Sequence, residues 1–236
     1  MSASNRIMDK SEIASNLKHH GTFKMVEDIA FRSLNKFVFF RVLKAMKVET
    51  INPEFLKCNE NFRGLFLPEG MLRNFARNPE YELSDRFLDQ AIEKGDECYG
   101  FLDGDVLAAY GWYSNKPTEA AWPGLVIHFN DQYIYMYKGF THFNYRGHRL
   151  HAIGKTMALA DYLARGYRGL VSYAEWNNFD SLRSNYRMGC TDFGNIYVAG
   201  GFNHYFVHSD VGCGRNGFGL ERVRPVSERA MAVSWR

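Results

Sequence analysis

Hydrophobic positions recur along the chain with two spacings, one typical of helices and one typical of strands. Helical spacing occurs over 69–77, where it stops before a proline, and again from Ser84 to Gly95. Ser84 favours a helix start and Gly95 a helix end, so both boundaries of the second helix are marked. The longest helical pattern covers 150–165, and a shorter one covers 178–189.

Runs of aromatic and β-branched residues predict strands. The most pronounced run, 133–140, is hydrophobic on both faces, as expected of a central strand. Asp103 and Gly104 lie between two apolar runs and predict a tight hairpin with positive φ at both central residues. Shorter runs predict further strands at 36–48, 125–127, 170–174, 193–198 and 205–207.

The order of these elements predicts a mixed α/β (α+β) sheet with one crossover helix. We expect residues 1–35 to form an N-terminal extension with a short helix at 11–17, and residues 36–236 to form a single domain. Residues 117–123 have the composition of a loop, and 212–219 that of a glycine-rich tail.

The composition fits a folded domain, since 46% of the 236 residues are hydrophobic and can form a sizeable core. The charges nearly balance, 29 basic against 26 acidic, without the strongly basic face of a nucleic-acid binder. No stretch approaches the roughly 20 apolar residues that span a bilayer, and 1–18 lacks the apolar core of a signal peptide. We therefore expect a cytoplasmic protein without a nucleic-acid partner or an integral membrane segment.

Metal and disulfide chemistry find no support in the residue spacing. No two cysteines have the Cys-x-x-Cys spacing of a zinc knuckle or redox pair; they are Cys58, Cys98, Cys190 and Cys213. His128 and His142 have no helix-spaced partner. We expect free, mostly buried thiols and no metal site.

The most informative segment joins the long central strand to the long helix. Three basic residues, Arg146, His148 and Arg149, lie in this turn, and Lys155 follows within the helix. Free N–H groups and the helix dipole favour an anion at a helix N-terminus. The pattern predicts a phosphate or pyrophosphate site, with a solvated basic turn as the alternative.

Two motifs in this part of the chain resemble those of the GNAT superfamily of acyltransferases. Residues 145–150, Tyr-Arg-Gly-His-Arg-Leu, resemble the loop that binds the pyrophosphate of acyl-CoA. Residues 178–189 resemble the second motif, in which an Asn caps a short helix that ends at Gly. The resemblance covers a motif core of about residues 97–200 and implies a mixed central sheet with two splayed parallel strands, flanked by helices.

The resemblance also implies where an acyl-CoA would lie. Its pantetheine arm would enter between 137–141 and 170–174, with backbone groups near Phe140 and His142 as partners, and its pyrophosphate would lie on the turn. The residues expected to contact it are Phe140, Thr141, His142, Arg146, Gly147, His148, Arg149, Leu150, His151, Ala152, Asn178 and Ser181.

The chain departs from the family pattern at three positions. Arg149 and His151 stand where the family's loop has small residues, which leaves open side-chain contacts to phosphate or the phosphopantetheine of a carrier protein. Asn185 stands where the family often has a Tyr that acts as general acid for the leaving thiolate. Tyr186 follows one position later, about 100° around the helix.

The resemblance implies an N-acyltransferase that moves an acyl group from acetyl-CoA or another acyl-CoA to a small-molecule or peptide amine by direct attack. Tyr186 is the candidate acid, and Glu175 is the first candidate base, ahead of Asp131 and His142. Two alternatives stay open. One is long-chain transfer from acyl carrier protein, as in N-acyl amino acid synthases, and the other is a non-catalytic GNAT-fold binding module. The sequence names neither the acceptor nor the oligomeric state.

Overall fold

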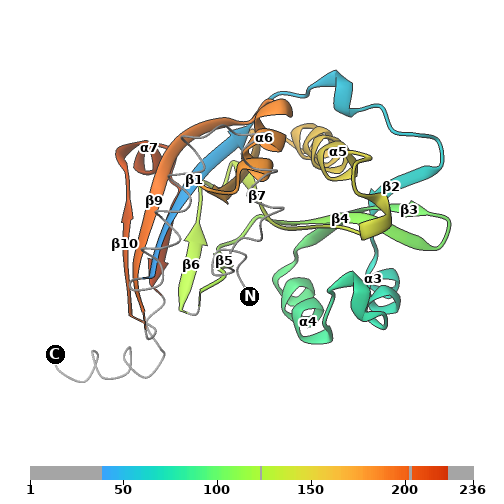
Figure 1. The fold of residues 1–236 in the computed structure, drawn as a ribbon, viewed down its shortest axis with the longest axis horizontal. Coiled ribbons are helices and arrows are strands. Elements are labelled where there is room, and N and C mark those ends of the chain that lie inside the picture. The colour runs from blue at the N-terminus through green and yellow to red at the C-terminus, as the bar shows by residue number, and fades with distance from the viewer. Residues whose placement is uncertain (1–38, 123, 202–203, 223–236) are drawn as a thin grey trace, which may run out of the picture.

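The computed structural model describes residues 39–122, 124–201 and 204–222. The expected extension and its helix at 11–17 lie outside the described residues. The main sheet has the strand order β10-β9-β1-β8-β7-β4-β3-β2 (Figure 1). Its strands are β1 (Phe39–Val48), β2 (Phe62–Phe66), β3 (Glu97–Asp103), β4 (Val106–Ser114), β7 (Tyr133–Thr141), β8 (Gly169–Glu175), β9 (Thr191–Gly201) and β10 (His204–Ser209).

The described helices follow the predicted ones closely. They are α3 (Glu69–Ala76), α4 (Asp85–Lys94), α5 (Leu150–Ala164), α6 (Phe179–Arg187), the short α7 (Val211–Arg215) and the one-turn η2 (Pro53–Phe55), η3 (Pro79–Tyr81) and η4 (Phe143–Tyr145). Ser84 caps α4, its Oγ accepting from the Phe87 N–H at 3.3 Å, and Gly95 ends it at φ 86°. Both predicted boundaries of this helix are confirmed. The Ser84 side chain supplies an acceptor for an N–H group that the helix itself leaves without a partner.

The predicted hairpin forms between β3 and β4, which pair antiparallel. Positive φ occurs at Gly104 (56°) but not at Asp103, so the expectation of two positive φ angles is wrong. The predicted first strand takes a central place, because β1 pairs antiparallel with both β8 and β9. The last two predicted strands form the antiparallel hairpin of β9 and β10.

A second, three-stranded sheet was not predicted, although the strand expected at 125–127 is confirmed as its middle strand. It consists of β11 (Gly219–Arg222), β6 (Leu125–His128) and β5 (Thr118–Glu119), in that order. The expected loop at 117–123 therefore contains a strand, and the glycine-rich tail folds into α7 and β11. Glycine is required in this tail because a Cβ at Gly212 would run into the backbone carbonyl of Phe193.

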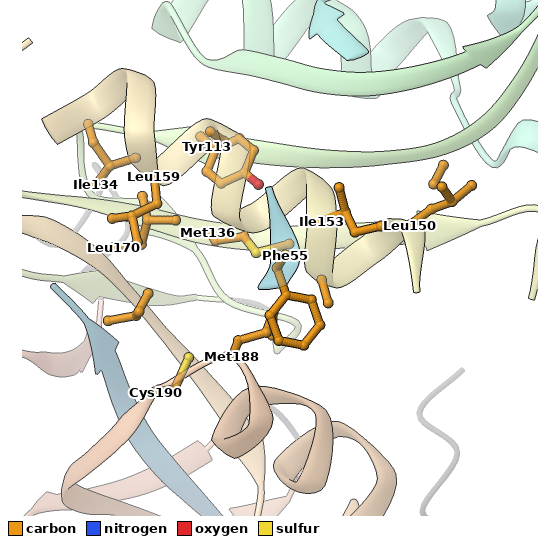
Figure 2. Packing of buried hydrophobic residues seen from close by; sticks show 14 of the residues in the cluster. Phe55, Tyr113, Ile134, Met136, Leu150, Ile153, Leu159, Leu170, Met188 and Cys190 are labelled. Atoms are coloured by element: carbon orange, nitrogen blue, oxygen red, sulfur yellow. The ribbon is translucent and has the colours of Figure 1, made fainter. Parts of the chain in front are cut away.

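The core consists of three hydrophobic clusters around the main sheet. The first lies beneath α5 and includes Ile134, Met136 and Leu170 of the two central strands (Figure 2). The second joins the opposite face of the sheet to the small sheet, and the third joins it to α3 and α4 (Figure 1). Helices α5 and α6 thus share one side of the central strands.

Candidate active site

The parallel strands β7 and β8 pair over only three residues and then separate. The pairing joins Tyr133, Ile134 and Tyr135 to Gly169, Leu170 and Val171. Beyond this point, the rest of β7 pairs with β4, and the rest of β8 pairs with β1. The facing edges of β7 and β8 therefore lose each other as partners after Val171, and the stretch over which the two edges are unpaired is called the opening. This splay is the feature that the family resemblance implied.

The phase of β7 decides which backbone groups face the opening. The His142 N–H donates to the Ala108 carbonyl at 3.0 Å, so His142 points toward β4. Because successive residues point to opposite edges, Phe140 shares this direction, and Gly139 and Thr141 face the opening. The backbone groups of Phe140 and His142 therefore point toward β4, and contact of either these residues or Gly139 and Thr141 with a ligand stays a prediction.

The N-terminus of α5 lies at the predicted basic turn. Arg149 occupies the N-cap position at φ 60°, and its side chain makes no capping hydrogen bond. Gly147, two residues earlier, has φ 88°. The first N–H groups of a helix have no acceptor within the helix, so those of α5 remain available to an anion.

An open cleft of about 640 Å³ lies between η2, the start of α5, and α6. It is lined by Glu54, Phe55, Arg149, His151, Ala152, Asp180, Arg183, Ser184 and Arg187. The sequence analysis missed Arg183 and Arg187, although their spacing of four residues places them on one face of α6. It also missed η2, whose start is marked in the sequence by the Asn52 cap and by Pro53 at the first helical position.

The bulky residues of the loop have defined places. The Arg149 guanidinium lies over the Phe55 ring, 4.9 Å from its centroid, so Arg149 takes the left-handed backbone of a glycine while its side chain turns to the cleft wall. His151 packs on β7, where a Cβ on Gly139 would be 2.5 Å from its Cε1. The space that His151 needs is thus provided by a glycine on the strand.

His151 is uncharged at neutral pH. Burial first, and the charge of Lys155 second, lower the pKa of His151 to about 4. Its imidazole therefore offers hydrogen bonds at the opening without adding to the positive charge of the cleft.

The other expected contact residues lie in different surroundings. Ala152 lines the cleft, and Thr141 faces the opening through its backbone. Leu150 is buried in the core, and His148 turns its ring toward Phe62, with the centroids 6.1 Å apart. Asn178 caps α6 through Ser181, whose N–H donates to the Asn178 Oδ1 at 3.2 Å.

In addition, Arg146 and Gly147 are exposed in the turn. The Asn cap of the second motif is confirmed, while contact of any of these residues with a ligand stays a prediction.

The candidate acid and bases lie in different surroundings. Tyr186 is 45% exposed, and its hydroxyl donates to the Asp192 carboxylate at 2.8 Å, on the solvent side of α6. Glu175 lies at the end of β8, with Oε2 3.9 Å from the Arg41 Nε. Asp131 is exposed in the turn before β7, at the opposite end of that strand from the turn that leads into α5.

His142, the remaining candidate base, is buried at 7% exposure. Its ring stacks on Phe143, with centroids 4.5 Å apart, and its Nδ1 accepts from the Asn144 N–H at 3.4 Å. None of the four candidates lines the cleft. Their catalytic roles stay predictions.

Lys155 differs from its expected place beside the phosphate turn. It lies on the sheet side of α5, is 3% exposed, and contacts Ser172 of β8 and Asn185 of α6. Asn185 stands at the position that the resemblance assigns to a tyrosine. Its side chain therefore accepts a hydrogen bond from a lysine of the neighbouring helix.

No cluster of three or more His, Cys, Asp or Glu side chains suited to a metal ion occurs in 39–122, 124–201 and 204–222. The cysteines are unpaired thiols, three buried and Cys58 half-buried.

None of the described helices combines the length and apolar character needed to cross a membrane.

Comparisons by sequence give no relative. No protein-family model matches the chain, and no curated protein matches its sequence.

Solved structures give a likeness of fold at low identity. A GCN5-related N-acetyltransferase-like protein from Streptococcus suis is 12% identical, with 77% of this chain and 67% of that chain covered and a TM-score of 0.49. A GNAT-family acetyltransferase from Colwellia psychrerythraea is 14% identical, with 73% and 61% covered and a TM-score of 0.46. A GCN5-related N-acetyltransferase from Sphaerobacter thermophilus is 12% identical, with 84% and 57% covered and a TM-score of 0.47.

This chain spans less than two thirds of the last two proteins. Its own topology is a mixed sheet in which two central parallel strands, joined by the crossover helix α5, pair briefly and then separate. The described part of the chain thus has the mixed sheet with two separating parallel strands that its sequence motifs implied.

Proposed function

We propose that this protein is an N-acyltransferase that takes an acyl group from an acyl-CoA, with acetyl-CoA as the simplest donor, and passes it to an amine. The observation that carries the proposal is the splay of β7 and β8 directly beside the basic cleft at the start of α5. An extended pantetheine arm can pair with strand edges that have lost their partners. The anionic end of the donor would then reach the cleft.

The charge of the cleft favours a nucleotide donor. Its lining carries three guanidinium groups, from Arg149, Arg183 and Arg187, against the carboxylates of Glu54 and Asp180. Guanidinium groups recognise phosphate in a bidentate manner, and the helix N-terminus adds N–H donors. A coenzyme A molecule brings a diphosphate and a further phosphate to this surface, whereas the phosphopantetheine of a carrier protein brings a single phosphodiester. The cleft therefore fits the coenzyme better.

The loop accommodates its large residues without covering the helix N-terminus. Arg149 turns toward Phe55, and His151 packs down on Gly139. We infer that both residues replace the close backbone approach of a glycine loop with side-chain contacts.

The transfer itself would be direct. The acceptor nitrogen attacks the carbonyl carbon of the thioester, and an N–H of Gly139 or Thr141 on the open edge of β7 stabilises the oxyanion. The acceptor is a small-molecule or peptide amine. Among the candidate bases, Glu175 at the end of β8 is the one on a strand that borders the opening.

The test is isothermal titration of the full-length protein with coenzyme A and acetyl-CoA. Arg149→Gly removes the guanidinium and suits the left-handed backbone at φ 60°, where alanine would add strain. We expect this variant and Arg183→Gln each to weaken binding by roughly tenfold, the loss of about one charge-assisted contact. Arg222→Gln, an exposed arginine in the small sheet, is the matched control and should leave binding unchanged.

The outcomes separate the alternatives. If all three variants bind coenzyme A as tightly as the wild type, the phosphates do not bind in the cleft. If the folded wild type binds neither compound, the nucleotide donor is excluded, and the same titration with acyl-loaded carrier protein tests the second hypothesis. A protein that binds a donor but transfers its acyl group to no amine would be a binding module.

A further inference from the structure

A lysine is buried at the apex of the opening. The Lys155 side chain belongs to a residue that is 3% exposed. Its Nζ donates to the Asn185 Oδ1 at 2.8 Å and lies 3.4 Å from the Ser172 Oγ and 3.6 Å from the Cys190 Sγ. All three partners are uncharged acceptors, and only the first contact is short.

No carboxylate balances this ammonium in the part of the chain that the structure describes. Buried charges are normally paired, because taking an ion out of water is costly. A methionine or leucine would fit the apolar cluster around it at a lower cost. A cation kept there without an anion is suited to a negative charge that appears only during a reaction.

The position of Lys155 relative to the strands says where that charge would arise. Val171 is the last residue of β8 paired with β7, and Ser172 is the first beyond it. The Nζ beside Ser172 is therefore at the point of separation, on the α5 side of the sheet. Figure 2 shows Cys190 and Met188 in the same cluster as Leu170 of β8 and Met136 of β7.

We infer that Lys155 is a catalytic residue that stabilises and protonates the leaving thiolate, and that Asn185 is its positioning residue. The inference rests on the proposed function. The acceptor nitrogen forms the new C–N bond, and the C–S bond breaks with its electron pair going to sulfur. The Lys155 ammonium donates a proton to that sulfur and is reprotonated, through solvent, by the proton that the acceptor nitrogen loses. The products are an amide and a free thiol.

The Tyr186 hydroxyl, the other candidate acid, does not lie near the Lys155 Nζ. Tyr186 is exposed and bonded to Asp192, whereas Asn185, one residue earlier, faces inward and holds the Lys155 Nζ. The Asn185 Nδ2 donates in turn to the Ser181 carbonyl at 2.9 Å, which fixes the amide with its oxygen toward the lysine. The arrangement presents an ammonium where a tyrosine hydroxyl would otherwise act.

The first experiment measures the thiol of bound coenzyme A. Ultraviolet absorbance of the thiolate is followed during a pH titration of coenzyme A, free and bound to the full-length protein, with desulfo-coenzyme A as the blank. We expect the bound thiol of the wild type to ionise at least about one pKa unit below the free thiol, a tenfold shift in the equilibrium. Lys155→Met should return it to the free value, and Arg222→Gln, in the small sheet, should not.

The second measurement is steady-state acyl transfer. Lys155→Met should lower kcat by about 100-fold with little change in KM, the signature of an interaction made mainly in the transition state. Bound coenzyme A whose thiol titrates like free coenzyme A in the wild type would overturn the inference, whether or not the variant folds. Failure of the wild type to bind coenzyme A would instead overturn the proposed function.

Discussion

The Lys155 Nζ and the Asn185 Oδ1 are 2.8 Å apart, and this contact joins α5 to α6 across the point where β7 and β8 separate. Both side chains are buried. One hydrogen bond thus joins the two helices that border the cleft and fixes a positive charge where β7 and β8 separate.

The two residues should be energetically coupled. Asn185→Leu leaves the buried ammonium without its short acceptor, so we expect a loss of about 2–3 kcal/mol of unfolding free energy. Adding Lys155→Met removes the charge as well and should recover part of it, with a coupling energy of at least about 1 kcal/mol. Urea unfolding of the wild type, both single variants and the double variant measures this. Additive losses would show that the contact is energetically unimportant.

Gly139 should be intolerant of a methyl group only while His151 is present. A Cβ at Gly139 would be 2.5 Å from the His151 Cε1 and 2.9 Å from its Nδ1. Gly139→Ala should therefore cost about 1–3 kcal/mol by overpacking. In a His151→Ala background the same change should cost much less. Gly70→Ala in α3, where nothing lies within 4 Å, is the control and should be neutral or stabilising.

Acid should destabilise the protein through His151. Its pKa is lowered from 6.5 to about 4. Between these two pH values the imidazole is therefore mostly protonated in the unfolded chain and mostly neutral in the folded protein. This contribution is complete above pH 6.5 and is lost as the pH falls toward 4, by up to about 3 kcal/mol at about 1.4 kcal/mol per pKa unit. Urea unfolding at about pH 7 and about pH 4.5 should show a smaller loss for His151→Gln than for the wild type. Equal losses would contradict the assignment.

Tyr186 should be dispensable for catalysis. Its hydroxyl reaches Asp192 on the solvent side, so Tyr186→Phe removes one exposed hydrogen bond and should cost no more than about 1 kcal/mol. We expect kcat to stay within about twofold of the wild type. A folded Tyr186→Phe protein with about 100-fold lower kcat would restore the general acid that the family resemblance implied, and would count against Lys155.

The folded tail makes a prediction with a built-in comparison. A Cβ at Gly212 would collide with the Phe193 carbonyl, whereas one at Gly214, in the same helix, has nothing within 4 Å. Gly212→Ala should lower the unfolding free energy by more than about 2 kcal/mol, because a strand backbone cannot move aside cheaply. Gly214→Ala should have no such effect. Thermal unfolding of the two variants decides whether α7 is packed against β9 in solution.

Local signals in the sequence predicted most elements of the main sheet and its helices. The caps at Ser84 and Asn178 are examples, since a side chain two or three residues from the N–H it accepts needs no tertiary partner. The hairpin of β3 and β4 is another, set by the turn around Gly104. The small sheet was not predicted because β5 has only two residues and β11 begins in a glycine-rich stretch. Neither segment is long enough to show an alternation of hydrophobic and polar residues.

The sequence by itself determined the basic turn, the helix that follows it and the Asn-capped helix, because each depends on contacts within a few residues. The tertiary structure alone decided that Arg183 and Arg187 share a cleft with Arg149. It also decided that the Lys155 side chain points from α5 toward β8 and α6. Positions 155, 172 and 185 are far apart in the chain, and they meet because α5 and α6 pack on the same side of β8. A helical residue's spacing gives the face it occupies, but what that face contacts depends on how the strands below it diverge.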